Sequence, residues 1–195
     1  MSRPSVLRLS HGVTVWLTGL PGAGKSTVAR TVASLVGDAV EVEVLDGDEV
    51  RKTISSDLGF SRQDRDEQGR RVGFIAELLA RHRVLTLVPV IAPYAETRAA
   101  VRQHHQRRGT PFVEVHVSTD LEECVRRDPK GLYARAAAGE ITGLTGVDDV
   151  YERPEHPELR LDTAGLDAET AAQQVLRLLA TSAGADVARE SFSVL

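Results

Sequence analysis

The stretch "GLPGAGKST", Gly19 to Thr27, constrains this 195-residue chain more than any other feature. It matches the pattern G-x-x-x-x-G-K-[ST] in full and stands between an apolar run and a helical pattern, as a phosphate-binding loop does. Backbone N–H groups of such a loop converge on phosphate oxygens, Lys25 reaches the β- and γ-phosphates, and Ser26 can ligate Mg²⁺. We therefore expect ATP or GTP with Mg²⁺. The expected nucleotide-binding residues are Gly19, Gly22, Ala23, Gly24, Lys25, Ser26 and Thr27.

Short β-branched runs alternate with longer amphipathic runs along the chain. This pattern predicts an α/β fold, a P-loop NTPase-type three-layer sandwich with a mostly parallel central sheet, helices on both faces and a lid segment. The expected strands are Val13 to Leu20, Val40 to Asp48, Val84 to Tyr94, Pro111 to Thr119 and Pro157 to Thr163. The expected helices are Lys25 to Asp38, Asp64 to His82, Ala95 to Arg108, Asp120 to Asp128 and Asp167 to Thr181.

The domain organisation follows from length and from one interruption of this pattern. With 42% apolar and 27% charged residues, the chain suits one compact domain, which we expect to span residues 1–195. Residues 128–157 break the alternation with glycines, prolines and charges, so we interpret them as a long functional loop that acts as a lid. We expect residues 184–195 to form a flexible tail.

Charge and hydropathy exclude several classes of partner. A net charge of −4 gives no bulk attraction to nucleic acid or to an anionic membrane. No apolar run is long enough to cross a bilayer, and the N-terminus lacks the continuous apolar core of a secretory signal. We therefore expect a cytoplasmic protein without nucleic-acid or membrane partners.

Cysteine and histidine offer no evident metal site. The single cysteine, Cys124, excludes an intrachain disulfide and a cysteine-rich metal site, and we expect it to be a small packed residue. The adjacent His104 and His105 point to different sides of a helix, and no carboxylate is near them in sequence. We expect both to lie on the solvated surface.

Other classes of nucleotide-binding protein compete at this stage. The "DTAG" of Asp162 to Gly165 resembles a GTPase switch motif, but it follows the last expected strand, and no N-K-x-D motif occurs in the chain. We therefore interpret that match as chance. A protein ATPase remains open, because "VEVLDGD" could supply the carboxylate that such a protein needs.

Two carboxylates, Asp46 and Asp48, stand at the exit of the second expected strand, the edge where ligands bind in open α/β sheets. Asp48 could orient an acceptor hydroxyl and take its proton late in a loose transition state, while Asp46 could hold a water of Mg²⁺. The same residues would also suit a helix cap and a tight turn. From these residues alone, both readings stay open.

A dense set of charges surrounds Phe60 between Leu58 and Arg71. Such a run is usually a solvated helix face. It would also suit an acceptor that carries its own anion, held by arginine forks and stacked on an aromatic ring. Phe60 beside Arg65 fits a nucleotide-like acceptor.

Five segments occur in order across residues 13–163, namely "GLPGAGKST", "LDGDEVR", "LGFSRQDR", "VIAPY" and "DPKGLY…GEITGLTGVDDVYERPEHPELRLDT". With them the chain resembles the adenylylsulfate kinase family. The resemblance implies transfer of the γ-phosphate of ATP to the 3′-hydroxyl of adenosine 5′-phosphosulfate, which gives 3′-phosphoadenosine 5′-phosphosulfate for sulfate assimilation. It also implies Mg²⁺ and a homodimer.

The resemblance assigns roles by position. Asp48 would orient the hydroxyl, with Asp46 beside it and Lys25 on the phosphates as the other catalytic residues. Arg51 and Arg65 would bind the phosphosulfate. The implied acceptor-binding residues are Asp48, Arg51, Phe60, Arg65, Gln68, Ile91, Lys130 and Leu144, with Phe60 stacked on the adenine and Lys130 at the base of the lid.

The chain also departs from the family pattern. Gln68 replaces an asparagine, Gly69 an aliphatic residue, Leu144 a phenylalanine that stacks on the acceptor adenine, Val150 a proline, and Ala92 a serine. Losing half of the aromatic sandwich could loosen base selectivity. A same-fold kinase for another small nucleotide, such as a cytidine diphosphoramidate, therefore stays open, and the sequence leaves undecided whether Gln68 and Leu144 alter acceptor choice.

Overall fold

The computed structural model describes residues 11–182, and the expected tail at 184–195 lies outside them. Five strands form one sheet in the order β2-β3-β1-β4-β5. Every neighbouring pair is parallel, so the sheet is parallel throughout, where the sequence suggested mostly parallel. The strands are β1 Val13–Thr18, β2 Val42–Val44, β3 Leu85–Pro89, β4 Phe112–Val117 and β5 Leu159–Leu161.

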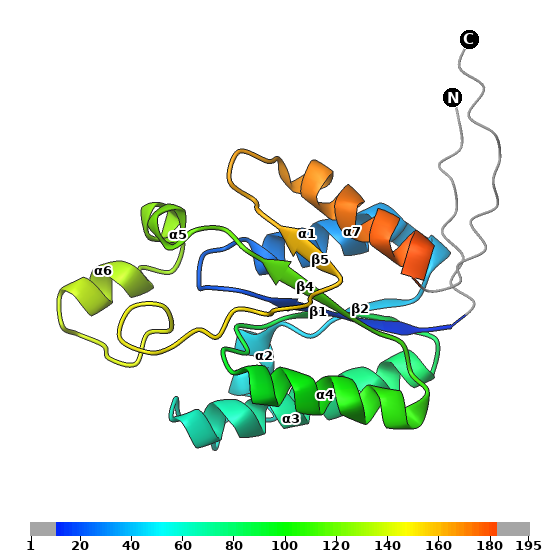
Figure 1. Cartoon of the computed structure of the whole chain (residues 1–195), viewed down its shortest axis with the longest axis horizontal. Helices are drawn as coiled ribbons and strands as arrows, with labels where there is room; N and C mark the ends of the chain where they lie inside the picture. Colours follow the sequence, from blue (N-terminus) through cyan, green and yellow to red (C-terminus); the bar gives the residue numbers. More distant parts are fainter. Residues whose placement is uncertain (1–10, 183–195) are drawn as a thin grey trace, which may run out of the picture.

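Helices cover both faces of this sheet (Figure 1). The helices are α1 Lys25–Val36, α2 Gly47–Lys52, α3 Arg62–Arg81, α4 Ala95–Arg108, α5 Leu121–Arg127, α6 Leu132–Ala137 and α7 Ala168–Ser182, with a 3₁₀ turn at Gly37–Ala39. Helices α1 and α7 lie on one face and α2, α3 and α4 on the other, which confirms the three-layer α/β sandwich. None of the helices within residues 11–182 is both long and apolar enough to span a membrane.

Strand β1 is the centre of the core and is buried along its whole length. Val15 and Leu17 belong to the apolar cluster on the α1 and α7 side, whereas Trp16 belongs to the cluster on the α3 and α4 side. Because successive side chains of a strand point to opposite faces, β1 is fixed from both sides. The loop that follows it at Gly19 therefore starts from an anchored strand.

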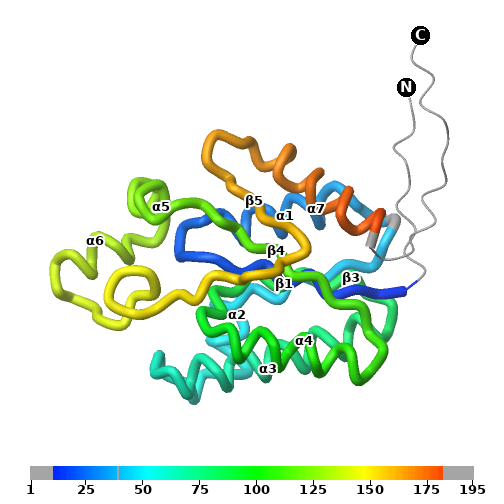
Figure 2. The backbone as a smooth tube through the Cα atoms, in the orientation of Figure 1, coloured from blue at the N-terminus to red at the C-terminus, as the bar shows by residue number. Residues whose placement is uncertain are grey.

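Helices α5 and α6 and the long segment after them project beyond the carboxyl ends of the strands, as the tube in Figure 2 shows. Helix α6 was not expected, so the prediction of an irregular loop throughout residues 128–157 was wrong for Leu132–Ala137. Gly131 starts α6 in a left-handed conformation, and the Asp128 carboxylate accepts the N–H groups of Tyr133 and Ala134. This capping stabilises a helix too short to show periodicity.

All five strands are shorter than the expected ranges, and two of them, the second and the third, end well before the expected residue. The second ends at Val44, because Asp46 accepts the N–H of Asp48 and begins α2. The third ends at Pro89, and the chain then turns through Ala92, whose φ of 42° no extended strand can contain. Both strands therefore end where the candidate site begins.

The expectation of a solvated histidine pair was wrong for His105, which is fully buried. Its Nδ1 lies 2.9 Å from the Val101 carbonyl oxygen and its Nε2 2.9 Å from Thr14 Oγ1. Burial lowers the pKa of His105, so the ring is a neutral core group. His104 keeps partial exposure and approaches Glu77, a carboxylate 27 positions away that sequence distance concealed. Cys124 is buried, as expected.

Helices α3 and α4 approach closely where α3 carries two glycines. A Cβ on Gly69 would lie 2.5 Å from Thr97 Cγ2, and one on Gly73 would lie 2.8 Å from a methyl of Val101. Glycine within a helix costs about 1 kcal/mol relative to alanine. The close packing of α3 against α4 offsets this cost, because a larger residue at either position would push the two helices apart.

Replacing Gly69 with alanine tests this contact. We expect the overlap with Thr97 to outweigh the gain in helix propensity and to lower the free energy of unfolding by about 1–2 kcal/mol. The double variant Gly69→Ala/Thr97→Ser removes the clashing methyl and keeps a hydroxyl for Asp66, so it should recover most of that loss. Urea unfolding of the wild type, both single variants and the double variant measures the coupling. Purely additive changes would contradict the proposed overlap.

Candidate active site

The loop after β1 has the geometry of a phosphate cradle. Gly19, Gly22 and Gly24 have φ values of 155°, 76° and 98°, which favour glycine. A Cβ on Gly19 would also lie 2.4 Å from the carbonyl oxygen of Val117. Gly24 is the N-cap of α1, so the loop ends at the positive pole of a 12-residue helix.

Lys25 lies over this loop rather than pointing into solvent. Its Nζ donates to the carbonyl oxygens of Gly19 at 2.8 Å and Leu20 at 2.7 Å, and the residue is buried. Burial penalises the charged amine and lowers the pKa of Lys25 to about 8. A cation held by two carbonyl oxygens in a low-dielectric site is suited to exchange them for phosphate oxygens.

Asp46 combines the two readings that the sequence left open. Its Oδ1 accepts the backbone N–H of Asp48 at 3.1 Å, which caps α2. Its Oδ2 accepts the hydroxyl of Ser26 at 2.9 Å and lies 3.2 Å from Arg30 Nη2. The second expected strand thus delivers a carboxylate to the start of α1. Ser26 and Asp46 form an all-oxygen donor set, which fits Mg²⁺.

Asp48 is the second residue of α2, at the same edge of the sheet, and it meets the lid. Its carboxylate forms an ion pair with the ammonium group of Lys130, which follows α5. Both side chains are open to solvent, at 62% exposure for Asp48 and 59% for Lys130. Residues 82 positions apart are thereby brought to one place beside the phosphate loop.

Arg51 and Arg65 converge on the ring of Phe60. Their guanidinium carbons lie 4.7 and 5.8 Å from the ring centroid, and Phe60 itself is 66% exposed. Burial, with the like charge of Arg65 nearby, lowers the pKa of Arg51. An anion bound between the two guanidinium groups would relieve this repulsion, and the exposed part of the ring offers a place for a base.

Arg65 also ties α3 to the lid. Its Nη2 donates to the carbonyl oxygen of Gly143 at 2.7 Å, and its Nε lies 3.4 Å from the Asp149 carboxylate. Asp149 in turn lies 3.4 Å from the hydroxyl of Tyr94. With 9% of its side chain exposed, Arg65 is enclosed between the lid and Phe60.

Comparison with known proteins adds the family to this geometry. Residues 11–162 match the adenylylsulphate kinase family. The chain belongs to this family. A curated adenylyl-sulfate kinase of Picosynechococcus sp. is 49% identical over 170 residues, which cover 87% of this chain and 94% of that relative.

Solved structures agree with the family assignment. The Mycobacterium tuberculosis APS kinase in complex with AMPPNP and APS is 49% identical and superposes with a TM-score of 0.85, over 88% of this chain and 99% of that one. A hexameric APS kinase from Thiobacillus denitrificans is 39% identical, with a TM-score of 0.65, over 90% of this chain and 29% of that one.

The structure places two departures of this adenylylsulphate kinase family member, Gln68 and Leu144. Gln68 is buried and its Nε2 makes only a long contact, 3.4 Å, to the carbonyl oxygen of Gly47. Its Oε1 is buried without a hydrogen-bond partner among the described residues. Leu144 is buried in the core cluster on the α1 side of the sheet. Ile91, another expected acceptor-binding residue, accepts the Thr18 hydroxyl on its carbonyl oxygen at 2.5 Å. An unsatisfied amide oxygen leaves Gln68 free to accept a bond from a ligand.

Sequence reasoning missed a second group of residues behind the phosphate loop. A cavity of about 140 Å³ adjoins Gly24 and is lined in part by Arg127, Thr163 and Leu166. Thr163 Oγ1 donates a hydrogen bond to the carbonyl oxygen of Ala23 at 2.9 Å and accepts one from Arg127 Nη1 at 2.8 Å. The "DTAG" segment, interpreted above as a chance match, thus supports the loop. Its only sequence signal was its place after a strand.

Proposed function

We propose that this chain transfers the γ-phosphate of ATP to the 3′-hydroxyl of adenosine 5′-phosphosulfate. The observation that carries the proposal is the meeting of Asp48 and Lys130 beside a complete phosphate loop, in a member of the adenylylsulphate kinase family. The related structure in complex with AMPPNP and APS supports the same donor and acceptor classes. The product would be 3′-phosphoadenosine 5′-phosphosulfate, so the role is sulfate activation.

The donor side uses the phosphate loop. Lys25 would exchange its two carbonyl partners for β- and γ-phosphate oxygens, joined by the N–H groups of residues 19–27. Ser26 and Asp46 would hold Mg²⁺, which when bound neutralises charge on the transferring phosphate. The cavity beside Gly24 offers the donor base a place next to Arg127 and Thr163.

The acceptor side uses Asp48 and the residues around Phe60. Asp48 would orient the 3′-hydroxyl; the hydroxyl oxygen forms a bond to the γ-phosphorus, the bond from phosphorus to ADP breaks, and the proton passes to Asp48. Arg51 and Arg65 would bind the phosphosulfate. The base would stack on Phe60, with Gln68, Ile91 and Leu144 lining the remainder. Lys130 and the lid, about residues 128–157, would exclude water during transfer.

A coupled assay for ADP release tests this function with the purified protein, ATP and Mg²⁺. The acceptor panel is adenosine 5′-phosphosulfate, AMP, CMP and a cytidine diphosphoramidate, with a no-acceptor blank. We expect turnover with adenosine 5′-phosphosulfate to exceed every other acceptor by at least tenfold in kcat/KM. Faster turnover with a cytidine nucleotide would instead show that the enzyme prefers a different acceptor, and would link Gln68 and Leu144 to that preference.

We also propose that two copies pair through the outer face of α3. Phe74 is 55% exposed and Leu78, one turn later, is also exposed, so this face carries adjoining apolar side chains. Such a patch favours association. Phe74→Glu should raise the dimer dissociation constant at least tenfold in sedimentation equilibrium, whereas Val125→Glu, at an exposed apolar position on α5, should not. A wild-type monomer at micromolar concentration would refute the pairing.

A cytoplasmic location is the remaining part of the proposal. The requirement for ATP and the free, buried Cys124 support it. Immunoblots of cell fractions should find the protein with cytoplasmic markers, and recovery with membranes would contradict this location.

A further inference from the structure

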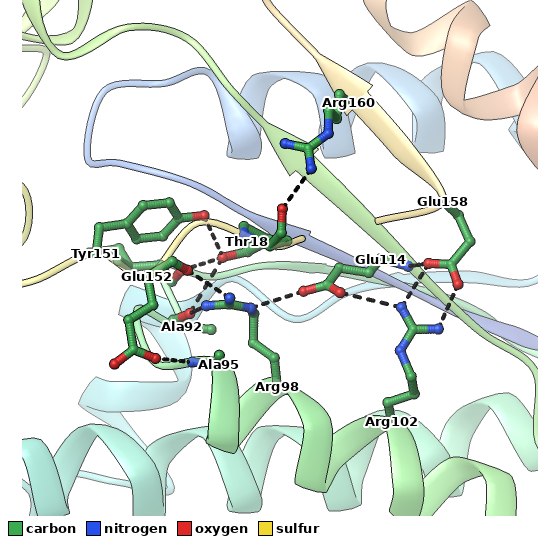
Figure 3. A network of polar contacts seen from close by, with 12 residues as sticks. Thr18, Ala92, Ala95, Arg98, Arg102, Glu114, Tyr151, Glu152, Glu158 and Arg160 are labelled. Carbon is green, nitrogen blue, oxygen red and sulfur yellow. Dashed lines mark hydrogen bonds and ion pairs between the residues drawn. The ribbon is translucent and has the colours of Figure 1, made fainter. Parts of the chain in front are cut away.

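Arg98 on α4 is almost fully buried, with 4% of its side chain exposed, and it uses its guanidinium in three directions (Figure 3). Its Nε lies 2.9 Å from the Glu114 carboxylate on β4. Its Nη1 donates to the carbonyl oxygen of Ala92 at 2.8 Å, and its Nη2 donates to that of Glu152 at 2.6 Å. One side chain therefore joins the sheet, the turn after β3 and the end of the lid.

The turn that Arg98 holds is conformationally unusual. Ala92 has a φ of 42°, in the left-handed region that a residue with a Cβ rarely adopts, so surrounding contacts must maintain it. The preceding carbonyl, that of Ile91, accepts the hydroxyl of Thr18, the last residue of β1. This turn, placed above in the acceptor site, is therefore fixed both to the strand that carries the phosphate loop and to Arg98.

The lid ends on the same turn. The Glu152 N–H donates to the carbonyl oxygen of Pro93 at 2.9 Å, and its carboxylate accepts the N–H of Ala95 at 2.7 Å. The hydroxyl of Tyr151 lies 3.0 Å from Thr18 Oγ1. Arg98 completes this junction by holding the backbone of Glu152 against that of Ala92 (Figure 3).

We propose that Arg98 is a positioning residue for the acceptor, acting through the Ile91–Ala92 turn and the lid end that it binds together. Only a guanidinium can reach a carboxylate and two carbonyl oxygens at once from a fixed fork, whereas an ammonium group would keep the ion pair and lose the fork. This inference rests on the proposed function. It adds a residue that contacts neither nucleotide and yet sets the geometry in which the acceptor is held.

The test compares Arg98→Lys with Arg102→Lys. Arg102 lies one turn along α4 and pairs with the same Glu114, but its other partners are Glu158 and the ring of Phe112, and it contacts neither Ala92 nor Glu152. We expect Arg98→Lys to raise KM for adenosine 5′-phosphosulfate at least tenfold and to leave KM for ATP within about twofold. Arg102→Lys should change neither KM by more than about twofold. Loss of folded protein alone would lower kcat at unchanged KM.

Hydrogen exchange gives a second readout that needs no activity. Amides of residues 144–156 should exchange at least tenfold faster in Arg98→Lys than in the wild type or Arg102→Lys. If the wild type is active and folded Arg98→Lys has an unchanged KM for adenosine 5′-phosphosulfate, the inference about Arg98 is overturned and the proposed function is not. A wild type without acceptor-dependent turnover would overturn the proposed function. If the amides of residues 144–156 then also exchanged at the same rate in Arg98→Lys and the wild type, the role of Arg98 in holding the lid end to the Ile91–Ala92 turn would be overturned as well.

Discussion

Replacing Asp48 with asparagine is expected to lower kcat about a thousandfold while ATP binds as in the wild type. Asparagine keeps the size of the side chain and can still face Lys130, but it cannot take a proton from the acceptor hydroxyl. The cap of α2 uses the backbone N–H of Asp48 and is unaffected. In the proposed function the donor phosphates contact the loop at residues 19–27, so the affinity for ATP should not change.

The neighbouring carboxylate provides the control for this experiment. Glu49 is exposed on the same helix, and Glu49→Gln removes one negative charge at nearly the same place. Steady-state ADP release gives kcat for both variants, and titration calorimetry gives the affinity for a non-hydrolysable ATP analogue. Equal kcat in Asp48→Asn and wild type would remove Asp48 from the proposed hydroxyl-orienting role.

Replacing Lys25 with methionine is expected to lower kcat/KM for ATP at least a thousandfold. Methionine has nearly the length of the lysine stem and suits the buried site, but it brings no charge to the β- and γ-phosphates. Lys52→Met is the matched control, since Lys52 is an exposed lysine at the end of α2. A Lys25→Met variant that retained more than a tenth of wild-type kcat/KM would contradict the assignment.

The pKa of Lys25 supplies an independent readout for the same variant. Burial lowers this pKa from 10.5 to about 8, so the cost of burying the ammonium group is present below about pH 8 and disappears as the pH rises from 8 to 10.5. Phosphate oxygens favour the charged form. At pH 8 the amine of Lys25 is about half-protonated before ATP binds and should be fully protonated afterwards. Binding of ATP should therefore take up about half a proton from the buffer. Calorimetry in buffers of different ionisation enthalpy measures the uptake, which Lys25→Met should abolish.

The sequence predicted the sheet and the donor loop well, because both follow from short-range patterns. Alternation of β-branched and amphipathic runs indicated parallel strands with covering helices, and the loop motif placed Lys25 and Ser26 on α1. Strand β1, which is buried along its whole length, lies within the expected run Val13 to Leu20. Local composition alone was sufficient for these features.

Contacts between distant segments could not be read from local patterns. Helix α6 depends on the Asp128 carboxylate and on the left-handed conformation of Gly131. His105 can be buried because its ring forms a hydrogen bond with Thr14, on a strand 91 positions earlier. Thr163 supports the phosphate loop from across the sheet. Each of these features needs a partner that only the fold supplies. The roles of Phe60 and Arg65 came from the family resemblance and stay predictions.

The exposed pair of Asp48 and Lys130 bears on what the enzyme does when ATP is bound and the acceptor is absent. The ammonium group of Lys130 occupies Oδ2, one of the two carboxylate oxygens that could accept a hydrogen bond from another hydroxyl or from water. Ion pairs this open to solvent are weak, so an incoming hydroxyl can displace the ammonium at little cost. In the proposed function, the lid lysine thus covers one oxygen of Asp48 until the acceptor hydroxyl takes its place.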